Sequence, residues 1–109
     1  MKIDVSKLSL DMLNAAKIVL LQEWPEVQNY AKTEFKKIAE DIAMIQEMKL
    51  NDEITEERAR LHLEIQKNAT RTVLLAIQGL GIIAVEQAIN AALDVVKGTV
   101  NKALGWDLL

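Results

Sequence analysis

The stretch VQNYAKTEFKKIAEDIAMI, residues 27–45, decides the fold class of this chain. Its apolar side chains recur at steps of four, four, three, four and three residues, a spacing that gathers them on one face of an α-helix. These side chains are Val27, Ala31, Phe35, Ile38, Ile42 and Ile45. Most of the charged side chains point away from this face, so the stretch predicts an amphipathic helix that packs against other helices. They include Lys32, Lys36, Lys37 and Glu40, with Glu47 just after the stretch.

Upstream of this stretch, the sequence predicts an earlier helix over residues 8–23. Ser6 or Ser9 can cap the start of that helix. Pro25 disfavours helical geometry at Trp24 but suits the first turn of a new helix. We therefore expect a bend at Trp24, or a kink within one longer helix.

Downstream, the sequence predicts a tight helical hairpin at residues 50–53, which contain the turn-favouring Asn51 and Asp52. Thr55 is placed to cap a third helix, because acidic residues follow it directly. A narrow apolar stripe then runs along this helix, formed by Leu61, Ile65, Ala69 and Val73. No proline follows, so we expect a long helix, with a kink or break near Gly79 and Gly81 as the alternative.

The composition agrees with an all-α protein. Of the 109 residues, 50% are hydrophobic and 27% are charged, with one proline and four glycines, which is too few turn-forming residues for a β-rich fold. We predict a single helical domain over residues 1–109, a helical hairpin or three-to-four-helix bundle with a long apolar C-terminal helix that forms oligomers. The net charge of −3 supplies no positive field for nucleic acid. A cytoplasmic location is expected because no secretory signal is visible.

The C-terminal third carries few charges and contains two distinct flanks when placed on a helix. A polar arc collects Glu86, Gln87, Asn90, Asp94, Lys97 and Asn101. A flank of small residues collects Gly81, Ala84, Ala88, Ala91 and Ala92. This small flank is a candidate interface with a helix of a second chain; the alternative is that it packs against the first or second helix of its own chain.

The end of the chain carries the sequence of a helix cap followed by apolar residues. Gly105 suits a left-handed cap, and Trp106 and Leu108 are expected to fold back as a clamp that closes the bundle. The alternative is a docking tail that inserts into a groove on another subunit or another protein.

Catalytic, metal and cofactor motifs are not visible in the sequence. There is no cysteine, and His62 is the only histidine; Ala59 stands where a helical di-iron site would need glutamate. Gly79-Leu80-Gly81 lacks the third glycine of a dinucleotide-binding loop. We therefore expect no cofactor and no enzyme activity, with carboxylates assembled only by the fold as the alternative.

A membrane role is disfavoured, because the apolar run over residues 73–85 is shorter than the roughly 20 residues that span a bilayer. The prediction is a non-enzymatic helical interaction or assembly module that binds further copies of itself or another helical protein. The alternatives are a small-molecule or lipid carrier, in which the apolar flank of the last helix lines a cavity, and a membrane-interacting helical protein.

Overall fold

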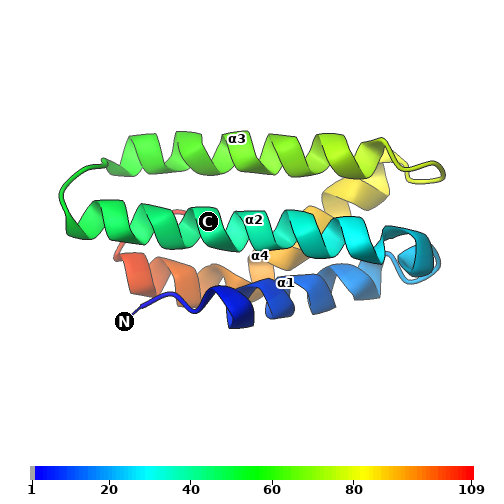
Figure 1. Cartoon of the computed structure of the whole chain (residues 1–109), viewed down its shortest axis with the longest axis horizontal. Coiled ribbons are helices and arrows are strands. Elements are labelled where there is room, and N and C mark those ends of the chain that lie inside the picture. Colours follow the sequence, from blue (N-terminus) through cyan, green and yellow to red (C-terminus); the bar gives the residue numbers. More distant parts are fainter. Residues whose placement is uncertain (1) are drawn as a thin grey trace.

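Four antiparallel helices, connected in an up-down-up-down order, form a bundle of 43 × 22 × 19 Å (Figure 1). The structure is a computed structural model, and it describes residues 2–109. The helices are α1 (Val5–Val19), α2 (Trp24–Leu50), α3 (Glu56–Leu75) and α4 (Ile82–Leu104). The predicted all-α bundle is therefore confirmed.

Helix α2 carries the apolar face that the sequence predicts. All six predicted positions, from Val27 to Ile45, are fully buried. Pro25 lies in the first turn of α2 and Glu26 accompanies it there, where the missing proline N–H has no helical partner to lose. The long central helix therefore follows directly from its local pattern.

Helix α1 begins and ends earlier than the prediction of residues 8–23. Asp4 caps it, since its carboxylate accepts a hydrogen bond from the Lys7 backbone N–H at 3.1 Å. The predicted caps were wrong, because Ser6 and Ser9 both lie inside the helix. The helix ends at Val19 and a turn over residues 20–23 leads into α2.

The hairpin between α2 and α3 lies where it was predicted. Asp52 adopts a left-handed backbone with φ of 56°, and the Thr55 hydroxyl accepts a hydrogen bond from the Arg58 backbone N–H at 3.2 Å. Helix α3 then runs back along α2 (Figure 1).

The predicted apolar stripe of α3 does not face the core. Leu61 and Ile65 are 59% and 70% exposed, and Ala69 is also exposed. The buried positions of α3 are instead Ala59, Leu63, Thr70 and Leu74. This face is the one that lies between α2 and α4, both of which contact α3, so tertiary packing overrides the local apolar pattern.

The predicted long third helix is interrupted between residues 76 and 81. Gly79 has φ of +93°, a left-handed conformation that helix interiors do not accept. Gly81 then occupies the N-cap of α4 with extended geometry. The break lets α4 turn back toward α1 and α2.

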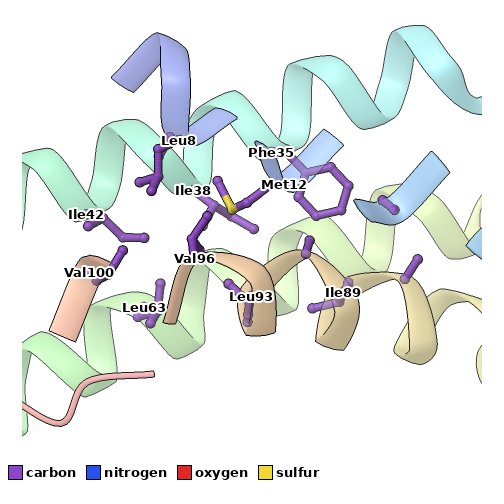
Figure 2. Close-up of a cluster of buried hydrophobic side chains, with 14 of the residues drawn as sticks. Leu8, Met12, Phe35, Ile38, Ile42, Leu63, Ile89, Leu93, Val96 and Val100 are labelled. Atoms are coloured by element: carbon purple, nitrogen blue, oxygen red, sulfur yellow. The ribbon is translucent and has the colours of Figure 1, made fainter. Parts of the chain in front are cut away.

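The core is built mainly where α1, α2 and α4 meet (Figure 2). Helix α4 makes its most extensive contact with α1, and α3 contacts α2 more than α4. The labelled core side chains are Leu8, Met12, Phe35, Ile38, Ile42, Leu63, Ile89, Leu93, Val96 and Val100. Helix α3 thus lies at the side of a three-helix core.

Candidate functional site

The small-residue flank of α4 is divided between the core and the surface. Ala88 and Ala92 are fully buried within the chain, so neither side chain is on the surface of this chain. Ala84 and Ala91 are half-buried, and Gly81 is exposed. The structure does not bring the five residues together as one exposed surface.

Ala88 and Ala92 lie on the side of α4 that faces α1. Val96 of α4 lines a groove together with Leu8 of α1, and Ala92 and Ala88 stand four and eight residues before Val96, on the same side of the helix. The pair of α1 and α4 has the most extensive contact in the bundle, and small side chains allow two helix backbones to approach. Gly81 has a different role, because a Cβ built there would meet no atom within 4 Å. Its position is the N-cap of α4, and it makes no close helix contact.

The apolar flank of α4 is filled by side chains of its own chain. Val96 and Ile89 lie among Met12 and Phe35 from α1 and α2 (Figure 2).

The C-terminal segment, residues 105–109, folds back along α4 and is named the tail here. Gly105 takes φ of +70°, a left-handed conformation, and its N–H bonds to the Asn101 carbonyl at 2.9 Å. Leu108 is buried at 7% exposure and Trp106 is half-buried. Leu108 lines a groove with Leu93 and Lys97 of α4, so the segment runs back along the helix from the cap at Gly105.

The Asn101 side chain makes four hydrogen bonds to the tail, three of them to backbone groups. Its Oδ1 accepts hydrogen bonds from the Leu108 and Leu109 N–H groups, each at 3.0 Å. Its Nδ2 donates to Asp107 Oδ1 at 3.2 Å and to the Leu109 carbonyl at 3.5 Å. One amide side chain thereby satisfies both donor and acceptor groups of the tail.

Two cations from other helices complete this binding site. Arg60 of α3 donates from Nη2 to the Asp107 carbonyl at 3.0 Å. Lys49 of α2 donates to the Leu104 carbonyl and lies 4.6 Å from the centre of the Trp106 ring. A cation over an indole face is attractive, and the bonded carbonyl is one that the end of α4 leaves free. We call Lys49, Arg60 and Asn101 the tail cradle.

The tail cradle was not predicted as a unit. Asn101 was placed in the polar arc, and its position four residues before the capping glycine was the available local signal. Lys49 and Arg60 lie 55 and 47 residues from the groups that they bind. No spacing pattern in a single sequence indicates contacts at that separation. The cation–π contact of Trp106 with Lys49 is a further contact of this kind.

An exposed apolar ridge on α3 is the second candidate site. Leu61 and Ile65, one helical turn apart, form this α3 ridge. A groove of about 620 Å³ lies beside it, lined by the ridge together with Met48 and Ile54. Glu57, Arg58 and His62 also line the groove, so an apolar surface is bordered by both signs of charge.

A polar group lies next to the ridge, where α2 meets α3. His62 Nδ1 is 3.9 Å from Asp41 Oδ1, and the Asp41 side chain is 13% exposed. Burial raises the pKa of the Asp41 carboxyl, and the nearby His62 charge partly opposes this effect. Asp41 Oδ2 and Gln66 Nε2 are buried without a hydrogen-bond partner among the described residues. Of these side chains only Asp41 and His62 can carry a charge, and they form a single weak ion pair.

The described part of the chain, residues 2–109, contains no metal-binding cluster and no membrane-spanning helix. No group of three or more histidine or acidic side chains is placed to hold a metal ion in this part of the chain. No helix in the same range combines the length and apolarity required to cross a membrane. Asp41 and His62 form a polar pair within the contact between α2 and α3.

No family model, no curated protein and no solved structure matches the chain.

Proposed function

We propose that this chain is a non-enzymatic helical interaction module that assembles with further copies of itself. The observation that carries the proposal is the exposure of two large aliphatic side chains, Leu61 and Ile65, side by side on α3. Fully burying one such side chain stabilises a contact by about 1.5–3 kcal/mol. A ridge of this kind next to a groove is typical of helix docking.

The position of α3 in the bundle supports the same proposal. Helix α3 contacts α2 along its length but contacts α4 less, and no contact of α3 with α1 is recorded. Its outer face therefore has no neighbour within the chain. A helix from a second copy, laid along this face, would cover the ridge and the groove beside it.

The experiment is sedimentation of the full chain at tens of micromolar, comparing wild type with Leu61→Glu/Ile65→Glu. We expect wild type to contain a dimer or larger species and the double variant to be monomeric. The matched control is Ile83→Glu, which changes another exposed isoleucine, 71% exposed, in the first turn of α4. A monomeric wild type, or a double variant that associates as wild type does, would refute the proposal.

A further inference from the structure

The tail cradle has the features of a peptide-binding site. It draws one side chain from each of three helices: Lys49 from α2, Arg60 from α3 and Asn101 from α4. Most of its hydrogen bonds are made to backbone groups of residues 104–109. The remaining recognition comes from the indole over Lys49, the Asp107 carboxylate and the buried Leu108.

The tail is joined to α4 by a single residue with an unusual backbone. Gly105 must keep φ at +70° for the tail to reach its own cradle. If Gly105 instead takes right-handed helical angles, α4 continues outward and carries the tail away from the cradle. A change at one residue thereby exposes the cradle and the tail of the same molecule together.

We propose that the cradle also binds the tail of a second copy of this chain, in a symmetric dimer that exchanges tails. The tail of another copy supplies the same groups that Arg60 and Asn101 bond to, and the same Trp106 ring for Lys49, so the occupant needs no new chemistry. Exchange between two copies closes on itself, because each copy gives one tail and receives one. The tail cradle is separate from the α3 ridge. Tail exchange can therefore be tested independently of the association through the ridge proposed above.

The concentration of protein determines which arrangement dominates. A tail tethered by one residue has a local concentration on the order of millimolar at its own cradle. The closed monomer therefore predominates in dilute solution, and exchange becomes favourable in concentrated protein or during refolding at high concentration. Substitution of Gly105 shifts the balance further, since a Cβ there is strained by the positive φ and lies 3.0 Å from Lys49 Nζ.

The test uses cross-linking, because the chain contains no cysteine and gives no background. One sample carries Arg60→Cys and a second carries Asp107→Cys; they are mixed, unfolded, and refolded together at high concentration. Arg60 reaches the tail through a long side chain, so a short bismaleimide joins the thiols, whereas a disulfide would require closer backbones. We expect a cross-linked heterodimer in high yield.

The matched control replaces Arg60→Cys by Glu26→Cys, an exposed position in the first turn of α2. Tail exchange predicts a yield several-fold higher for the 60–107 pair than for the 26–107 pair, and equal yields would overturn the proposal. Placing Arg60→Cys and Asp107→Cys in one dilute chain should give an intramolecular cross-link. Failure of that reaction would also overturn the proposal, since it would show that the tail does not occupy the cradle.

Two further backgrounds separate tail exchange from association through the α3 ridge. Adding Gly105→Ala to both samples should raise the heterodimer yield, because the strained residue favours the open tail. Adding Leu61→Glu/Ile65→Glu should leave the yield unchanged. Loss of the cross-link in the ridge variant would assign the dimer to the ridge and refute exchange.

Discussion

Asp41 couples its ionisation to the contact between α2 and α3. Burial raises the pKa of its carboxyl above the usual 3.8, so the folded chain binds this proton more tightly than the unfolded chain does. The stability due to this group is therefore largest below about pH 4 and falls as pH rises through the folded pKa. Asp41→Asn should remove this fall, and thermal unfolding followed by circular dichroism between pH 3.5 and 7 measures it.

His62 provides the control for the Asp41 prediction. Its positive charge lowers the pKa of the Asp41 carboxyl, so His62→Gln should move the loss of stability to higher pH. The stability of the double variant Asp41→Asn/His62→Gln should change with pH over this range as little as that of Asp41→Asn alone. A single Asp41→Asn variant that retains the full pH dependence would assign it to other carboxylates.

Thr70 is a buried polar residue whose replacement should stabilise the chain. It is fully buried, and its Oγ1 has no hydrogen-bond partner among the described residues. Thr70→Val keeps the shape of the side chain and removes the unpaired hydroxyl, so we expect a gain of about 1 kcal/mol in the free energy of unfolding. The control is Thr72→Val, since Thr72 is exposed and bonds to the Asn68 carbonyl. Denaturant titration measures both, and equal effects would contradict the argument.

At the scale of the helices, the contact between α1 and α4 depends on small side chains. Ala88 is fully buried in this contact region, so Ala88→Leu should overpack it and cost about 1–3 kcal/mol of stability. Ala84→Leu, at a half-buried position of the same flank, should cost much less. Chemical denaturation of the two variants measures the difference. Equal stability would mean that the flank does not pack closely.

Local signals predicted the elements whose determinants lie within a few residues. Thr55 and Gly105 act as the expected caps, because capping depends on the residue itself and its nearest neighbours. The sequence also predicted the buried face of α2 correctly. This face is apolar, and neighbouring helices cover it in the bundle.

The failures arise where packing decides. Leu61 and Ile65 stand in a regular apolar stripe, yet α2 and α4 cover a different face of α3. Single-sequence periodicity reports which face is apolar, and it does not report which face has neighbours. The break at Gly79 was left open for a similar reason, since an isolated glycine is tolerated in helices when packing favours it.

For the whole molecule, the tail is expected to contribute to stability. Truncation after Leu104 removes the buried Leu108 and the hydrogen bonds made by Asn101 and Arg60. A loss of even 1 kcal/mol lowers the Tm by about 4–8 °C in a domain of roughly this size. Calorimetry measures the shift. An unchanged Tm would instead favour a tail that serves only to bind a partner.

The lateral position of α3 also bears on how the native chain opens. Helix α3 buries four of its 20 residues and α1 three of its 15, whereas ten of 27 are buried in α2 and eight of 23 in α4. Helix α1 nevertheless makes the two most extensive helix contacts of the bundle, with α4 and with α2, while α3 contacts α2 and, to a lesser extent, α4. Segments that bury little apolar surface open in sub-global steps, below the free energy of complete unfolding. Native-state hydrogen exchange should therefore find the amides of α3 exchanging through a partial opening that leaves α1, α2 and α4 protected. A partly open state of this kind would present the α3-facing sides of α2 and α4 to solvent while the three-helix core persists.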